Sequence, residues 1–127
     1  MVPTAPEAIA EVARACSDTQ IRASLSDKLE DALPLAAATA GNREYLEASI
    51  FELRGQVSEA VVLLEQACDA QTSRLAWRYH LAELLLSAGR VDEAFEHASI
   101  CVQAAPTLPA YRYLLDKIRQ AAQNGQQ

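Results

Sequence analysis

Aromatic residues and glycine are scarce in this sequence. Aromatic side chains make up 6% of the 127 residues, and there are only four glycines. Alanine and leucine supply most of the apolar bulk, which favours closely packed helices over a sheet rich in valine, isoleucine and tyrosine. A chain of this length can bury roughly two-thirds of the surface that its unfolded form exposes, so it needs neither a metal ion nor a disulfide to fold.

Cysteine is also limited, to Cys16, Cys68 and Cys101, which are widely spaced and form no Cys-x-x-Cys pair. This pattern predicts neither a disulfide framework nor a zinc site, and we interpret the three as small buried apolar residues. We considered His80 and His97, with Cys101 four residues beyond His97, as candidate metal ligands. His97 is more simply a residue of a helix seam and His80 a partly exposed one. We therefore predict no metal and no cofactor.

Motifs that carry catalysis are missing as well. The sequence has no phosphate-binding glycine loop, no serine nucleophile elbow and no paired-carboxylate motif. Its acidic pairs, Glu30-Asp31 and Asp92-Glu93, suit solvated helical faces or first helical turns. We name no catalytic residue and predict that the chain is not an enzyme.

Positive charge is in deficit, since the formal net charge is -6 and the pI is near 4.8. Nucleic-acid binding depends on clustered Lys and Arg that neutralise phosphates, so nucleic acid is a poor partner. Residues 1–10 lack the basic start and continuous apolar core of a secretory signal, and no later stretch is long enough to cross a bilayer. These features predict a cytoplasmic protein without a membrane partner.

What the sequence does contain is an internal repeat with a period of 34 residues. Identical residues recur at this spacing: Tyr45, Tyr79 and Tyr113; Gly55 and Gly89; Val57 and Val91; Glu59 and Glu93; Ala60 and Ala94. The stretch 76–81 also recurs at 110–115, so a third copy begins and then stops. So many coincidences are seldom produced by chance.

Each full copy is typical of two helices joined by a tight turn. The pattern predicts helices over 43–53 and 75–88, and Gly55 and Gly89 follow where a left-handed residue usually closes a helix. A second helix follows in each copy, with a buried stripe at Ala60, Leu63, Leu64, Ala67 and Cys68 and at Ala94, His97, Ala98, Cys101 and Val102. Pro106 and Pro109 end the second pair.

These residues resemble the tetratricopeptide repeat family, over residues 41 to about 120. The second copy matches the family pattern at Leu81, Ala82, Gly89, Ala94 and Pro106, and the first copy at Ala48, Gly55, Ala60 and Ala67. The departures are Glu47 for leucine, Thr72 for proline, Cys101 for alanine, and Arg78 for an aromatic residue, with Trp77 one place earlier.

The predicted fold is therefore all-α: a short right-handed αα superhelix, a solenoid of helical hairpins with a C-terminal capping helix. Its parts form one domain: a diverged helical hairpin over 1–40, repeats over 41–74 and 75–108, the capping helix over 109–122 and a disordered polar tail over 123–127. Small residues let paired helices approach closely, so we expect Ala48 to face Ala60 and Ala82 to face Ala94.

In the first 40 residues, Pro6 opens a predicted helix to about Ala15, and Asp18 or Thr19 caps a second one. The second has an apolar stripe of Ile21, Leu25, Leu29, Ala32 and Leu33 and should end at Pro34. A short helical turn over 35–40 is then expected, stopped by Gly41.

The resemblance also implies a binding surface, because the first helix of each pair usually lines the concave side that holds a ligand. The residues expected there are Asn42, Tyr45, Ser49, Glu52, Tyr79, Glu83, Leu86, Tyr113 and Lys117, with Ala76, Ala110 and Gln120 on the same face. The three tyrosines either form a ladder for a partner or pack only against neighbouring helices. The lysine and asparagine of the family's two-carboxylate clamp are absent, which argues against a heat-shock co-chaperone role.

The resulting functional prediction is a protein-protein interaction module, an adaptor or scaffold that binds a peptide or helical segment. Two alternatives are a small acidic chaperone of a secretion system and the regulatory part of a larger enzyme. A homo-oligomer is also possible.

Overall fold

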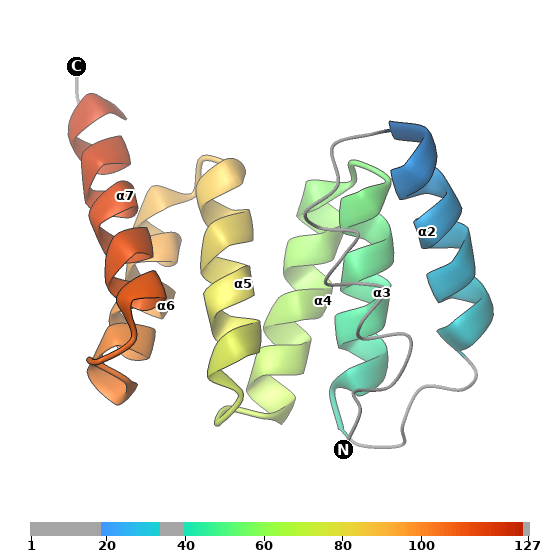
Figure 1. The fold of residues 1–127 in the computed structure, drawn as a ribbon, viewed down its shortest axis with the longest axis horizontal. Coiled ribbons are helices and arrows are strands. Elements are labelled where there is room, and N and C mark those ends of the chain that lie inside the picture. The colour runs from blue at the N-terminus through green and yellow to red at the C-terminus, as the bar shows by residue number, and fades with distance from the viewer. Residues whose placement is uncertain (1–18, 34–39, 126–127) are drawn as a thin grey trace. The chain divides into compact units, whose positions relative to one another are not determined.

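The computed structural model describes residues 19–33 and 40–125, and all regular structure within them is helical (Figure 1). The α-helices are α2 (Thr19–Ala32), α3 (Asn42–Leu53), α4 (Val57–Ala70), α5 (Leu75–Ser87), α6 (Val91–Ala104) and α7 (Pro109–Gly125). The predicted all-α, tetratricopeptide-like fold is thus confirmed. None of the helices described is both long and apolar enough to cross a bilayer.

The chain divides into two compact units, Met1–Gln71 and Thr72–Gln127. The first holds α2, α3 and α4, and the second holds α5, α6 and α7. The helix expected over 6–15, residues 35–39 of the turn expected over 35–40, and the end of the tail at 126–127 lie outside the described residues.

In the first unit, α3 packs against α4 and also against α2. Ala48 is 3% exposed and Ala60 is fully buried, together with Val61 and Leu64 on α4. Small buried side chains on both helices allow the close approach that a tight helical hairpin needs. Burial of these alanines agrees with the seam expected from the repeat pattern.

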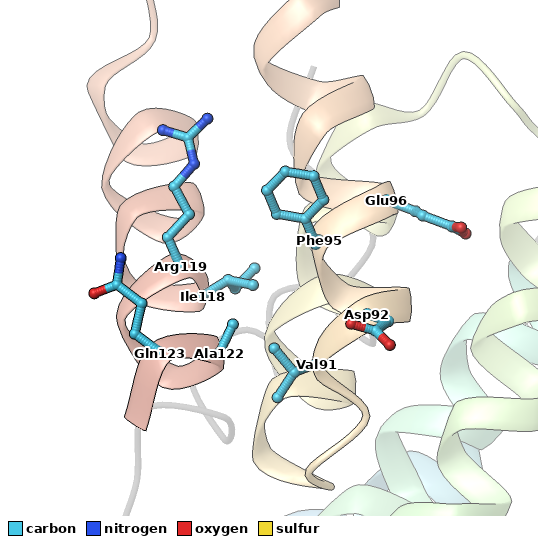
Figure 2. A pocket seen from close by; sticks show the side chains of 8 residues that line it. All are labelled: Val91, Asp92, Phe95, Glu96, Ile118, Arg119, Ala122 and Gln123. Carbon is cyan, nitrogen blue, oxygen red and sulfur yellow. The ribbon is translucent and has the colours of Figure 1, made fainter. Parts of the chain in front are cut away.

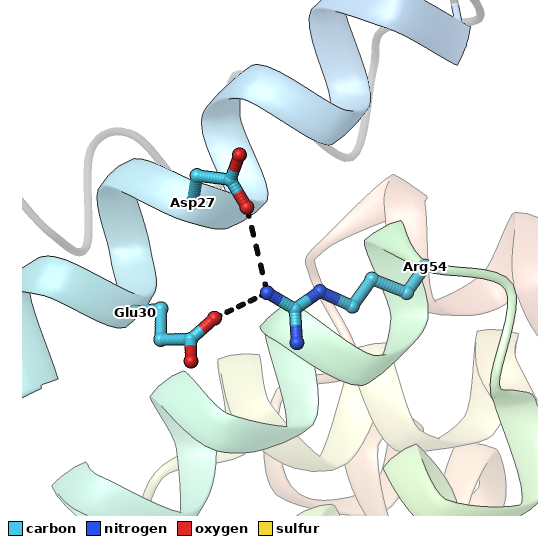
Figure 3. Close-up of polar contacts among 3 residues, drawn as sticks. All are labelled: Asp27, Glu30 and Arg54. Carbon is cyan, nitrogen blue, oxygen red and sulfur yellow. Dashed lines mark hydrogen bonds and ion pairs between the residues drawn. The ribbon is translucent and has the colours of Figure 1, made fainter.

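Helix α2 is held to this hairpin by both apolar and charged groups. Leu29 is fully buried, whereas Ile21 in the first turn is exposed, so the predicted apolar stripe does not include its first member. The Arg54 guanidinium, just after α3, forms ion pairs with Glu30 and Asp27, the latter at 3.5 Å (Figure 3). Near the other end of α2, Arg22 Nη2 donates a 3.1 Å hydrogen bond to the Glu52 carbonyl oxygen.

In the second unit, α6 packs against both α5 and α7, and α7 also touches α5. The core of this unit is made of fully or almost fully buried side chains from all three helices: Leu81, Ala82, Leu85, Ala94, Ala98, Cys101 and Ile118. Leu81 and Leu85 stand one turn apart on α5 and are both fully buried. Together these contacts fix α5 and α7 on the same side of α6.

The two repeat turns share one conformation. Gly55 and Gly89 have φ of +78° and +80°, the left-handed region that glycine adopts without steric cost. In each turn the glycine and the next residue donate backbone hydrogen bonds back into the helix, as Gln56 does to the Phe51 carbonyl (2.8 Å) and Arg90 to that of Leu85 (2.9 Å). This is the helix ending predicted from the glycine positions.

Helix ends differ slightly from the prediction. Helix α3 begins at Asn42 and α5 ends at Ser87, each one residue from the expected position. Helix α7 continues to Gly125, so residues 123–125 are helical rather than a disordered tail. No proline interrupts these residues, and Gly125 lacks the left-handed φ of the glycines that follow α3 and α5, so nothing local stops α7 earlier.

Candidate partner-binding site

The predicted binding residues of the first copy lie largely inside the first unit. Asn42, Tyr45 and Ser49 are 7%, 5% and 1% exposed, and Ser49 Oγ donates a 3.1 Å hydrogen bond to the Tyr45 carbonyl oxygen. Helix α3 packs against both α2 and α4. Three of the four residues expected on this face are therefore too buried to meet a partner, while Glu52 is half-buried.

The second copy and the third behave differently, because α5 and α7 form a cleft with a volume of about 300 Å³. Its lining residues are Glu83, Leu86, Ser87, Leu114 and Lys117. Three of these, Glu83, Leu86 and Lys117, were expected on the binding face. The structure thus brings predicted residues from two copies into one hollow within the second unit.

Sequence reasoning missed Ser87 and Leu114. Around the helix axis, each residue lies within about 60° of a residue predicted on the binding face. A prediction that allowed a broader face would have included both. The Ser87 hydroxyl donates a 2.7 Å hydrogen bond to the Leu84 carbonyl oxygen, which turns it back onto α5. Leu114 is 3% exposed and contributes a small apolar part of the cleft wall.

The tyrosines at equivalent repeat positions have three different environments. Tyr45 is buried, Tyr79 is half-buried, and Tyr113 is 70% exposed. The Tyr79 ring packs against Tyr111 of α7, with centroids 5.3 Å apart and planes tilted by 39°. Tyr45 and Tyr79 therefore pack within their own units, while Tyr113 presents an aromatic face to solvent.

The electrostatics around Tyr79 follow from this packing. Burial raises the pKa of the Tyr79 hydroxyl above its ordinary value, and the nearby Glu83 carboxylate raises it further. Glu83 also lies 3.9 Å from His80 Nδ1, an ion pair only when the imidazole is protonated. His80 itself is 7% exposed, so the prediction of a partly exposed side chain was wrong. Trp77, one turn before Leu81 on α5, is buried as well.

The residues considered as metal ligands have other roles in the packing. His97 Nδ1 lies 3.0 Å from Arg78 Nη1, across the seam between α5 and α6. Cys101 is fully buried with its Sγ 3.8 Å from the Leu75 carbonyl oxygen, and burial raises the pKa of its thiol. In the part of the chain that the structure describes, no three His, Cys, Asp or Glu side chains gather as metal ligands would. Cys68 is buried too, as interpreted, and Cys16 lies outside the described residues.

Comparison with known proteins agrees with the fold. The tetratricopeptide repeat family matches residues 53–118, just over half of the chain, and the chain belongs to that family. No curated protein was found that matches the sequence. Tetratricopeptide repeats generally mediate protein-protein interactions and are typically non-catalytic. The cleft between α5 and α7 is built from the helices that begin two successive copies of this repeat.

Proposed function

We propose that this protein is an interaction module, an adaptor or scaffold, that holds a peptide or helical segment of a partner protein in the cleft between α5 and α7. The observation that carries the proposal is the meeting of Glu83, Leu86 and Lys117 in one hollow of about 300 Å³. A cytoplasmic location is part of the same proposal and rests on the sequence alone.

The chemistry of the cleft favours a protein segment as the ligand. Leu86 and Leu114 supply apolar surface, while Glu83 and Lys117 supply one charge of each sign. A hollow of about 300 Å³ lies at the lower end of the range for ligand pockets, which suits a few side chains better than a large cofactor. We infer that an apolar side chain of the partner enters the cleft, with a basic group near Glu83 and an acidic group or a backbone carbonyl near Lys117.

Exposed groups on the same helical faces extend the contact area beyond the cleft. Tyr113 lies one turn before Lys117 on α7 and is 70% exposed. A tyrosine on a surface gives a partner both an apolar ring and a hydroxyl that exchanges hydrogen bonds. The proposed surface therefore consists of Tyr113, the cleft and the outward edge of Tyr79.

Partner capture followed by titration tests this proposal. Proteins retained by the tagged chain from an extract of the source organism are identified by mass spectrometry, and the bound segment is synthesised as a peptide. We expect Lys117→Glu and Tyr113→Ala to weaken binding of that peptide. Lys28→Glu on α2, an exposed residue of the first unit, gives the same change in net charge and serves as the matched control.

The result to expect is a Kd raised on the order of tenfold by Lys117→Glu and unchanged by Lys28→Glu. All variants should melt at the temperature of the unaltered chain, because the substituted side chains are exposed. If both the Lys117→Glu and the Tyr113→Ala variants bound the peptide as tightly as the unaltered chain does, the partner would bind elsewhere.

A further inference from the structure

A second hollow surface runs between α6 and α7, distinct from the cleft between α5 and α7. Val91 and Phe95 of α6 and Ile118 and Ala122 of α7 line a pocket of about 450 Å³ (Figure 2). Arg119 borders this pocket and also a neighbouring one of about 310 Å³, whose apolar lining is Val102 and Leu115. The two pockets share Arg119 as a lining residue, and we call them together the α6–α7 groove.

The apolar part of this groove remains accessible to solvent. Phe95 is 39% exposed, which is unusual for a phenylalanine in a small helical unit. The Arg119 guanidinium lies 5.9 Å from the centre of the Phe95 ring and covers part of it. The equivalent residue of the first copy, Val61, is fully buried. An exposed aromatic ring beside a groove is a common feature of protein interfaces.

The two walls of the groove carry opposite charges. The α6 wall has Asp92 and Glu96, and in Figure 2 the Glu96 side chain points away from α7. The α7 wall has Arg112 and Arg119, with Asp116 3.7 Å from Arg119 and balancing part of its charge. An acidic wall facing a basic wall across an apolar floor is a self-complementary arrangement.

Symmetry then decides which way two such grooves fit together. A twofold axis parallel to the groove places the α6 wall of one copy against the α7 wall of the other, so that acidic residues meet basic ones twice. A twofold axis across the groove would bring acidic residues against acidic residues. Charge therefore selects the first arrangement, in which the two α7 helices run parallel.

The distribution of charge along the chain is compatible with such self-association. Residues 72–127 contain six basic and five acidic residues, whereas residues 1–71 contain five basic and twelve acidic ones. Two copies that approach through their second units therefore meet little net repulsion. The whole acidic surplus belongs to the first unit and is screened beyond about 8 Å at physiological salt.

We propose that the α6–α7 groove binds a second copy of this chain and forms a twofold-symmetric dimer, in which Glu96 of each copy faces Arg119 of the other. Phe95 then packs at the centre against the partner's α7, and the charged walls form the rim. The cleft between α5 and α7 is a different surface, so this proposal does not depend on the proposed function.

The experiment measures the mass of the full chain by sedimentation equilibrium from low micromolar to submillimolar concentration. We expect a reversible monomer-dimer equilibrium. Glu96→Arg or Arg119→Glu alone should raise the dimer Kd on the order of tenfold, because each substitution turns two attractive contacts into repulsive ones. Asp69→Arg, a reversal of an exposed acidic residue on α4, should leave the Kd unchanged.

The decisive sample is an equal mixture of the two single variants. In a mixed dimer, the arginine introduced by Glu96→Arg in one copy faces the glutamate introduced by Arg119→Glu in the other. The second contact of that dimer joins an unaltered Arg119 to an unaltered Glu96. The mixture should therefore recover the affinity that each variant loses, which an unfolded variant would not do. A monomer at every concentration, open-ended polymers, or a mixture no tighter than its components would overturn the proposal.

Discussion

Glu83 and Lys117 stand 34 residues apart at equivalent repeat positions, and they bring opposite charges to one cleft. The repeat fixes where these two side chains project, because each lies on the first helix of its copy. It does not fix what they are. The pair shows a periodic scaffold that carries side chains of opposite charge at equivalent positions.

The seam between α5 and α6 should not tolerate a larger side chain. Ala82 and Ala94 are both fully buried, so Ala94→Leu adds volume where no space exists. We expect a loss of roughly 1 to 3 kcal/mol in the free energy of unfolding. Denaturation in urea measures this loss, and Ala104→Leu, at the exposed end of the same helix, is the control that should change little. Equal stability of both variants would contradict the proposed seam.

Gly89 should be difficult to replace because of its backbone conformation rather than its surroundings. No atom lies within 4 Å of the Cβ that another residue would add, but φ is +80°. Gly89→Ala should therefore destabilise the chain by about 1 kcal/mol, and Gly89→Asn by less, since asparagine adopts the left-handed region more readily. Gly125→Ala, where φ is not positive, should cost nothing in the same thermal melts. An equally harmless Gly89→Ala would show that this turn relaxes.

Alkaline pH should destabilise the second unit. Burial raises the pKa of the Cys101 thiol and that of the Tyr79 hydroxyl above their ordinary values, so in the folded chain both stay protonated at pH values where the unfolded chain releases their protons. The protonated groups stabilise the folded chain fully at pH values below their pKa in the unfolded chain. This stabilisation is lost as the pH rises through their pKa in the folded chain. We expect the urea midpoint to fall above pH 9.

Cys101→Ala provides the control for this pH dependence. The variant loses a titrating group, so its stability should decline less steeply with pH than that of the unaltered chain. Circular dichroism across a pH series measures both curves. Parallel curves would mean that the Cys101 thiol ionises equally in the folded and unfolded chain.

Two neighbouring residues of α2 should differ in what they contribute to its attachment. Leu29 is fully buried, and Leu29→Ala should cost about 2 to 5 kcal/mol. Glu30 pairs with Arg54 at an exposed position, so Glu30→Gln should cost much less, and less still in high salt. Urea denaturation at two salt concentrations separates these effects. A larger loss for Glu30→Gln would mean that charge rather than apolar burial holds α2.

Much of the fold could be predicted from the sequence because its signals are local and repeated. Gly55 and Gly89 mark the turns through a backbone requirement, and the buried alanines mark the seams through a steric one. The end of α7 was missed because a run of polar residues without proline or a left-handed glycine is compatible with both helix and coil. In such a run the last turns of a helix depend on neighbouring structure rather than on local pattern.

The site was harder to predict than the fold. The repeat register placed Glu83, Leu86 and Lys117 on one face, and they line one cleft, because equivalent helix positions project in equivalent directions. It could not show that Asn42, Tyr45 and Ser49 are buried, because their burial depends on how α3 packs within its own unit. Periodicity gives the direction of a side chain but does not say whether another part of the chain already occupies that space.

The uneven distribution of charge gives the two units different roles in the proposed binding of a partner. The first unit carries all of the negative surplus, and the cleft lies in the second, which is close to neutral. Under the proposed function, the net negative charge of residues 1–71 attracts a basic partner mainly at low ionic strength, whereas the selective contacts form with the mixed-charge cleft. Added salt should accordingly slow the approach of such a partner far more than it hastens its departure.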